Sequence, residues 1–176
     1  MWEHGFYEKR RLGRMVSTAA GLYLLNLPEV QWIKSVEDVP AYQEMGVDFE
    51  VEMSDGRTIL VEVKTDSYQS GAVFLETKCN GKDGCFVTSR ADVWLYVQYK
   101  LDRGYWLPMD EVRPYVLANA PRYKVGAAKS KAGGSTWVAE GLIVPIPEVV
   151  ENCPGARVYE DVLGGAIEVI QGVLTR

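Results

Sequence analysis

Two acidic residues and a lysine occupy polar positions in one short stretch of the chain, in which polar and apolar residues alternate. The stretch GVDFEVEMSDGRTILVEVKTD, residues 46–66, carries Asp48 before a turn and Glu62 and Lys64 after it. Two carboxylates that face each other repel unless a cation or a proton lies between them, and Mg²⁺ prefers such oxygen ligands together with a substrate phosphate. A lysine beside them can hold or help to deprotonate an attacking water and can screen the charge of the phosphate. These residue types predict metal-assisted hydrolysis of a phosphodiester.

The hydrophobic pattern around the turn predicts a β-hairpin that would bring these side chains together. Apolar and polar residues alternate on both sides of the SDG turn, which is typical of paired strands. A three-residue loop with its glycine in the left-handed conformation suits this turn, and it places Met53 opposite Arg57. Counting back along this register puts Asp48 opposite Glu62, on one face. A two-residue loop would set Asp48 against Val63 and would mix polar with apolar faces.

The rest of the chain predicts the elements that would surround this hairpin. In chain order we expect a helix over 6–26, a short strand over 30–33, a loop over 34–45, the hairpin strands over 47–53 and 59–64, strands over 71–79 and 93–100, a helix over 109–120, a basic, glycine-rich mobile loop over 121–136, a strand ended by Pro145 and Pro147, and a weak helix over 158–174. This order predicts an α/β or α+β sandwich around a mixed central β-sheet.

Composition bounds the class of protein. The 176 residues fit one domain, 1–176, with a core over about 6–120 and a C-terminal extension over about 121–176. No apolar run reaches the ~20 residues that cross a bilayer, and the charged N-terminus does not suit a signal peptide, so we expect a soluble, cytoplasmic protein. The net charge of −5 excludes a uniformly basic surface but leaves room for local basic patches. With three cysteines and one histidine, neither a disulfide framework nor a structural zinc site is favoured.

An acidic residue in one strand followed by E-V-K in the next resembles the PD-(D/E)xK nuclease superfamily. The segment SRADVWLYV, residues 89–97, is similar to the segment after the active-site strands in its phage and archaeal members, which include Holliday-junction-resolvase-like nucleases. The resemblance covers residues 6 to about 100 and implies a restriction-endonuclease-like core. Val47 stands where the family name has proline, which is a departure from the pattern.

The resemblance also implies roles for particular residues. Asp48 and Glu62 would bind Mg²⁺, with Mn²⁺ able to replace it, Val63 would offer its carbonyl, and Lys64 would be the catalytic lysine. Glu8 lies on the preceding helix, where many members place an acid near the metal. The substrate would be DNA, in recombination or repair, and a homodimer would be in keeping with junction-cleaving members.

Further residues have two readings each. Glu76 is a candidate additional ligand or the partner of a lysine, and Gln43, just before the hairpin, is a candidate phosphate contact. Two basic clusters are candidate DNA-binding surfaces or simply solubilising charges. The candidate DNA-binding residues are Arg10, Arg11 and Arg14 in the first helix and Lys124, Lys129 and Lys131 in the glycine-rich segment.

Three alternatives remain open at this point. The acidic residues could belong to a solvated hairpin face that is held only by cross-strand charge pairing. The chain could be a non-catalytic DNA- or protein-binding module on a nuclease-like scaffold. It could also be an unrelated α+β protein with an acidic surface.

Overall fold

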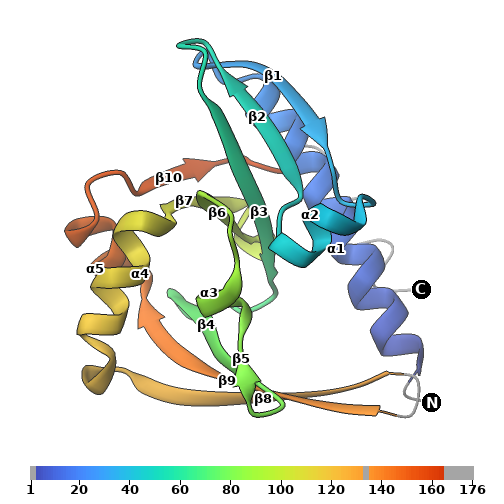
Figure 1. The fold of residues 1–176 in the computed structure, drawn as a ribbon, viewed down its shortest axis with the longest axis vertical. Coiled ribbons are helices and arrows are strands. Elements are labelled where there is room, and N and C mark those ends of the chain that lie inside the picture. Colours follow the sequence, from blue (N-terminus) through green and yellow to red (C-terminus); the bar gives the residue numbers. More distant parts are fainter. Residues whose placement is uncertain (1–2, 133–134, 165–176) are drawn as a thin grey trace.

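The computed structural model describes residues 3–132 and 135–164, and it is a mixed α/β structure (Figure 1). The helices are α1 (Glu3–Leu25), α2 (Pro40–Met45), α3 (Cys85–Thr88), α4 (Met109–Ala118) and α5 (Ile146–Asn152), with two 3₁₀ turns, η1 (Tyr99–Leu101) and η2 (Ala120–Arg122). The strands are β1 (Val30–Ser35), β2 (Phe49–Met53), β3 (Thr58–Asp66), β4 (Ala72–Cys79), β5 (Lys82–Asp83), β6 (Val93–Gln98), β7 (Arg103–Pro108), β8 (Lys124–Ala132), β9 (Ser135–Pro145) and β10 (Arg157–Glu160).

The central sheet is mixed, as the sequence predicts. Its strand order is β1-β2-β3-β6-β7-β10. Strands β1, β2 and β3 form an antiparallel meander, whereas β3 and β6 run parallel, so that Glu62 lies beside Trp94 and Lys64 beside Tyr96. Parallel neighbours require a crossover connection, and here the chain makes it through β4, β5 and α3.

A second sheet has the order β5-β4-β9-β8. The sequence does not predict this second sheet, which forms because β4 lies outside the central sheet and pairs with β9. Gly141 allows close packing here, since a Cβ at that position would stand 2.4 Å from the carbonyl oxygen of Leu75.

Both faces of the central sheet are covered in its middle, where β6 is buried throughout, whereas the edge strands β1 and β10 are mostly exposed. Helix α1 packs on one face, where Val16, Phe49 and Val61 belong to the same apolar cluster. The second sheet and helices α3, α4 and α5 cover the other face, where Trp94 and Phe86 lie at the centre of a second cluster (Figure 1). The side of β3 that carries Glu62 and Lys64 therefore faces a protein layer and not open solvent, which makes the solvated-face alternative wrong for Glu62.

Several predicted elements are confirmed and others are corrected. The helix over 6–26, the hairpin and the strands over 71–79 and 93–100 are present, and β9 ends at Pro145. The segment 34–45 is not all loop, because β1 continues to Ser35 and α2 follows. The segment 121–136 is not a mobile loop, because η2, β8 and the start of β9 occupy its described residues.

The chain after residue 145 also differs from the expectation. Helix α5 directly follows β9, and the predicted helix over 158–174 is wrong at its start, where β10 pairs with β7. The remainder of that predicted helix, from residue 165 on, lies outside the described residues. The segment expected as a C-terminal extension thus supplies strands to both sheets. Among residues 3–132 and 135–164, no helix has the length and apolar character needed to span a membrane.

Candidate active site

The hairpin has the predicted register from the turn back to Phe49, the first residue of β2. Met53 donates its N–H to the carbonyl of Arg57 at 2.8 Å, and the ladder continues to Phe49, which lies opposite Val61. Asp48 then breaks the alternation, because its own N–H also reaches the carbonyl of Val61, at 2.9 Å. Two residues opposite one is the arrangement of a β-bulge, which is frequent beside active sites.

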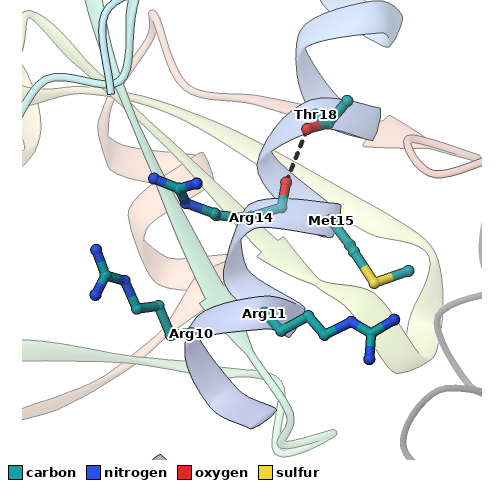
Figure 2. A pocket seen from close by; sticks show the side chains of 5 residues that line it. All are labelled: Arg10, Arg11, Arg14, Met15 and Thr18. Carbon is teal, nitrogen blue, oxygen red and sulfur yellow. Dashed lines mark hydrogen bonds between the residues drawn. The ribbon is translucent and has the colours of Figure 1, made fainter. Parts of the chain in front are cut away.

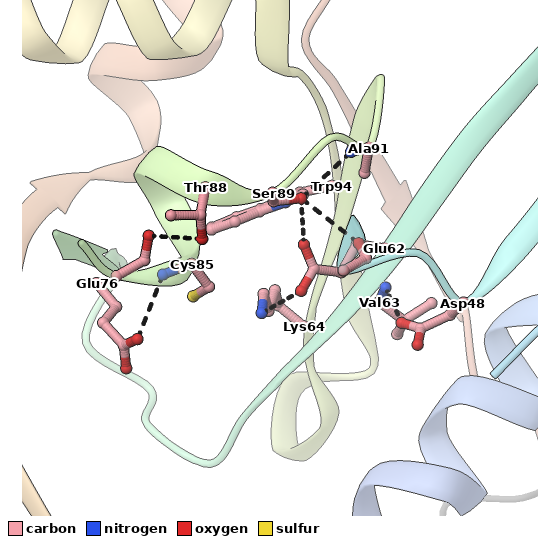
Figure 3. Close-up of polar contacts among 12 residues, drawn as sticks. Asp48, Glu62, Val63, Lys64, Glu76, Cys85, Thr88, Ser89, Ala91 and Trp94 are labelled. Atoms are coloured by element: carbon pink, nitrogen blue, oxygen red, sulfur yellow. Dashed lines mark hydrogen bonds and ion pairs between the residues drawn. The ribbon is translucent and has the colours of Figure 1, made fainter. Parts of the chain in front are cut away.

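The bulge changes where the neighbouring side chains point. Val47 and Phe49 would share a face in a regular strand, but Val47 packs in the apolar cluster of the second layer and Phe49 packs in the cluster under α1. Asp48 therefore does not face Glu62 directly across the ladder. Figure 3 shows the two carboxylates on either side of Val63, so the expected face-to-face pairing is corrected to a site arranged around this residue.

The carboxylate of Asp48 is held by the backbone of β3. Its Oδ2 accepts a hydrogen bond from the N–H of Val63 at 2.7 Å. The pKa of Asp48 is raised to about 6. Burial raises this pKa most, the Val63 hydrogen bond and the charge of Lys64 lower it, and the negative charges of Glu62 and Glu37 raise it. The charges of Asp48, Glu62 and Lys64 thus act on one another, as expected of one site.

Glu62 is a buried carboxylate with two partners. Its side chain is only 9% exposed. Its Oε1 forms an ion pair with the ammonium of Lys64, and its Oε2 accepts a hydrogen bond from the hydroxyl of Ser89 at 2.7 Å (Figure 3). Gly46, at the end of α2, closes over this group, since a Cβ there would stand 3.3 Å from Oε2.

The hydroxyl of Ser89 can donate in one direction only. Its oxygen accepts hydrogen bonds from the indole N–H of Trp94 at 3.2 Å and from the N–H of Ala91 at 3.3 Å. A serine hydroxyl has two lone pairs and one hydrogen, so both lone pairs are used and the hydrogen remains. The carbonyl of Gly46 is 3.4 Å away, whereas Glu62 is 2.7 Å away. Ser89 therefore directs its hydrogen to Glu62 and fixes that carboxylate.

Lys64 is a partly covered cation beside an aromatic ring. Its side chain is 27% exposed, and its Nζ lies 4.9 Å from the centre of the Trp94 ring. Burial alone lowers the pKa of Lys64, but the negative charge of Glu62 and contact with the thiol of Cys85 outweigh burial and raise it. Lys64 is consequently an ammonium at neutral pH, suited to binding negative charge and unsuited to accepting a proton.

Helix α4 supports the segment that carries Ser89. The guanidinium of Arg113 donates to the carbonyl of Phe86 at 2.8 Å and to the carbonyl of Ser89 at 2.9 Å. Burial lowers the pKa of Arg113, and the negative charge of Glu62 opposes this shift. Arg113 thus places a second positive charge close enough to the Glu62 carboxylate for the two charges to act on each other.

The additional candidate ligands have other contacts. Glu76, on β4, accepts a hydrogen bond from the N–H of Cys85 at 3.3 Å and so joins β4 to the start of α3. Gln43 is exposed on α2 and donates to the carbonyl of Glu37 at 2.6 Å, which stabilises the turn before that helix. Glu8 lies in α1, but its side chain is outside the described residues. Among the side chains that the structure describes, no group of three or more His, Cys, Asp or Glu residues forms a ready-made metal site.

The basic residues of α1 surround a shallow cavity of about 410 Å³ (Figure 2). Arg10 and Arg14 project to one side of the helix, and Arg11 projects to the other beside Met15. Arg14 forms an ion pair with Asp38, whose side chain is exposed. The arginines are therefore accessible, and one of them is already partly neutralised.

The second basic cluster lies on a strand instead of a loop. Lys124 and Lys129 are exposed on β8, which is an edge strand of the second sheet and contacts α1. The side chain of Lys131 is outside the described residues. Strand β8 contacts the helix that carries the arginines, which the sequence alone does not predict.

Sequence reasoning missed two residues that fix the site. Ser89 lies in the SRAD segment that drew attention only as a resemblance, and Arg113 lies inside a helix without any motif. Asp92, from the same segment, accepts a hydrogen bond from the N–H of Leu60 at 2.8 Å and so joins this segment to β3. A buried serine is recognisable as a positioning residue only once its donors are known.

No protein-family model, curated protein or solved structure matches this chain. Its function therefore has to be inferred from the contacts described above.

Proposed function

We propose that the protein is a divalent-metal-dependent DNA nuclease whose site is built from Asp48, Glu62, Val63 and Lys64. The observation that carries this proposal is the hydrogen bond from the N–H of Val63 to Asp48 at 2.7 Å. It attaches the first carboxylate to the residue that lies between Glu62 and Lys64. The two carboxylates and the ammonium of Lys64 are thereby brought together on β3.

The donor set suits Mg²⁺ or Mn²⁺. A carboxylate has about four lone-pair positions, so the contacts of Glu62 with Lys64 and Ser89 leave it able to bind a cation. Because the N–H and C=O of one strand residue point to the same edge, the carbonyl of Val63 lies on the edge where Asp48 binds. These are oxygen ligands, which hard divalent cations prefer. A buried carboxylate with a raised pKa is also stabilised when a cation replaces its proton.

The chain's own residues have distinct roles in hydrolysis. Water adds to phosphorus and releases one proton to solvent, the bond between phosphorus and the leaving oxygen breaks, and that oxygen takes a proton from solvent. Lys64, as an ammonium, stabilises the charge that grows on the phosphate. Glu62 is held by Ser89 so that it keeps one orientation, and Asp48 is held by Val63. A bound divalent ion would act as a Lewis acid and lower the pKa of the attacking water.

The order of elements supports this proposal. Helix α1 precedes the antiparallel meander β1-β2-β3, and β6 returns parallel to β3. The resemblance to the nuclease superfamily implies a helix before the active-site strands, and α1 lies in that place, while β4, β5 and α3 form the crossover. The acids lie near the carboxyl half of β3, next to the crossover that leaves it.

The test is cleavage of supercoiled, linear, single-stranded and branched DNA with Mg²⁺ or with EDTA. We expect cleavage with Mg²⁺ only, and a loss of roughly 10²-fold or more in Lys64→Ala, because one preorganised charge contributes about that much. Lys34→Ala is the matched control, since this lysine on β1 is half exposed and pairs with Glu50 at 3.3 Å. The absence of metal-dependent cleavage of every substrate would overturn the proposal. DNA affinity that persists unchanged in EDTA, without cleavage in Mg²⁺, would support a binding module instead.

A further inference from the structure

A cavity of about 640 Å³ opens directly beside Lys64. It lies between the end of β3, the loop 67–71, strands β4 and β6, and the edge strand β8, with Leu12 of α1 at one side. Lys64 and Trp94 belong both to its wall and to the candidate active site. The cavity is therefore continuous with the place where a phosphate would meet the ammonium.

The walls of this cavity are largely aromatic and small. Tyr68 stands at its mouth with 73% of its surface exposed, and Phe74 and Tyr96 form the inner wall. Among its described side chains, strand β8 contributes Gly126, Ala127 and Ala128, which are small and leave the space between the sheets open. Flat aromatic faces at the mouth and inside a cavity are what a nucleobase stacks on.

The acidic residues of the cavity select against a phosphate inside it. Asp66 and Glu76 line the wall with Lys64. Asp66 accepts a hydrogen bond from the hydroxyl of Tyr96 at 2.9 Å, so its carboxylate is fixed toward the interior. These carboxylates would repel a phosphate, but they can accept hydrogen bonds from the amino and imino groups of a base.

We propose that this cavity binds an unpaired nucleobase next to the scissile phosphate, so that the substrate class is DNA with a single-stranded segment or end. This inference rests on the proposed function, because it places the phosphate at Lys64. A volume of about 640 Å³ falls in the range of roughly 300–1,000 Å³ that encloses one small ligand, which a nucleotide is. A duplex, whose major groove alone is about 12 Å wide, is too large to enter. The bound DNA strand would continue toward the exposed arginines of α1, which neighbour Leu12 in the sequence.

The experiment measures binding without cleavage. Fluorescence anisotropy in EDTA would compare three short labelled DNAs: a single strand, a blunt duplex and a duplex with a single-stranded tail. We expect the single strand and the tailed duplex to bind more tightly than the blunt duplex. Tyr68→Ala should weaken binding of the single strand about fivefold to a hundredfold, the range of base stacking on one aromatic ring, and should leave the blunt duplex unaffected.

Two variants serve as controls. Tyr68→Phe keeps the ring and should retain the affinity of the original protein. Trp32→Ala removes an exposed aromatic residue of β1, 49% exposed and outside the cavity, and should change nothing. Equal affinity for blunt duplex and single strand, no detectable DNA binding, or an unchanged affinity in Tyr68→Ala would overturn the inference.

The readouts separate this inference from the nuclease proposal. Metal-dependent cleavage together with indifference to unpaired DNA would leave the nuclease intact and would reject the cavity as a base site. Tyr68-dependent binding of single strands without any cleavage would keep the base site and would reject the nuclease.

Discussion

Glu62 is oriented by a hydroxyl whose direction is fixed by two other donors. In Ser89→Ala the carboxylate loses this hydrogen bond, and the indole N–H of Trp94 loses its acceptor. We expect Mn²⁺ affinity to fall about 10–100-fold, the usual loss for a residue that orients a ligand, and the free energy of unfolding to fall by about 1.5–3 kcal/mol. Calorimetric titration and urea unfolding measure the two quantities.

A neighbouring hydroxyl provides the control for this variant. Thr88 donates to the carbonyl of Gly84 at 3.1 Å and does not contact Glu62. Thr88→Ala should leave Mn²⁺ affinity unchanged, and Ser89→Thr should recover most of it. Equal metal affinity in Ser89→Ala and the original protein would contradict the positioning role.

The raised pKa of Asp48 should make the unfolding free energy fall as the pH rises. Its pKa is raised by burial to about 6 in the folded protein, against 3.8 when unfolded. The folded state therefore holds a proton between about pH 4 and pH 6 that the unfolded state has released, so this group's stabilisation is complete below pH 4 and is lost as the pH rises through 6. The difference between the two pKa values corresponds to at most ~3 kcal/mol of unfolding free energy. Partial exposure of Asp48 reduces this contribution to about 1–2 kcal/mol.

The variant Asp48→Asn tests this sign. Measured in EDTA, its unfolding free energy should exceed that of the original protein by about 1–2 kcal/mol at pH 8, and the difference should vanish near pH 4. Such a gain at the expense of activity is common for active-site residues. A variant that is less stable than the original protein at pH 8 would contradict the account.

The residues of the site were predictable in type and only partly in geometry. The alternation around the SDG turn identified Glu62 and Lys64 on one side of β3, since a strand has a period of two. The bulge at Asp48 was not predictable, because it depends on Val47 packing in one layer and Phe49 in the other. Ser89 joins the site from 27 residues beyond Glu62, a contact that no local pattern reports.

At the scale of elements, the start of α3 is packed against β4 with no space for a side chain. A Cβ at Gly84 would stand 2.5 Å from the carbonyl oxygen of Glu76. Gly84→Ala must therefore push α3 away from β4, and Ser89 at the end of α3 moves with it. We expect a loss of about 1–3 kcal/mol in unfolding free energy and weaker Mn²⁺ binding.

Gly13→Ala is the matched control for that variant. No atom lies within 4 Å of a Cβ at Gly13 in α1, so alanine should stabilise the helix by roughly 0.5–1 kcal/mol. Urea unfolding compares the two glycines directly. Gly84→Ala with undiminished stability would show that α3 is not held as tightly as described.

Elements with strong local periodicity were predictable, and those set by distant pairing were not. Helix α1 and the hairpin follow from the spacing of apolar residues. The small and basic residues of 124–132 read as a loop, yet they form β8 because β9 offers a partner along its whole length. Likewise β10 has an exposed, mostly polar pattern and becomes a strand only through pairing with β7.

At the scale of the whole molecule, the site lies between a sheet and the layer that covers it, so binding there should stabilise the fold. A ligand at 100 times its dissociation constant adds about 2.7 kcal/mol to the unfolding free energy. We expect Mg²⁺ or Mn²⁺ to raise the melting temperature, EDTA to reverse the rise, and Asp48→Asn to abolish it. Asp55→Asn, in the exposed hairpin turn where Asp55 pairs with Arg57, should behave like the original protein.

The most direct measurement is a crystal soaked in Mn²⁺ and analysed by anomalous scattering. We expect one strong peak at bonding distance from oxygen atoms of Asp48 and Glu62 and from the carbonyl of Val63. We also expect Lys64 to stay beside Glu62, in the wall of the cavity. Density elsewhere on the protein, with these three residues unligated at a saturating Mn²⁺ concentration, would contradict the central claim.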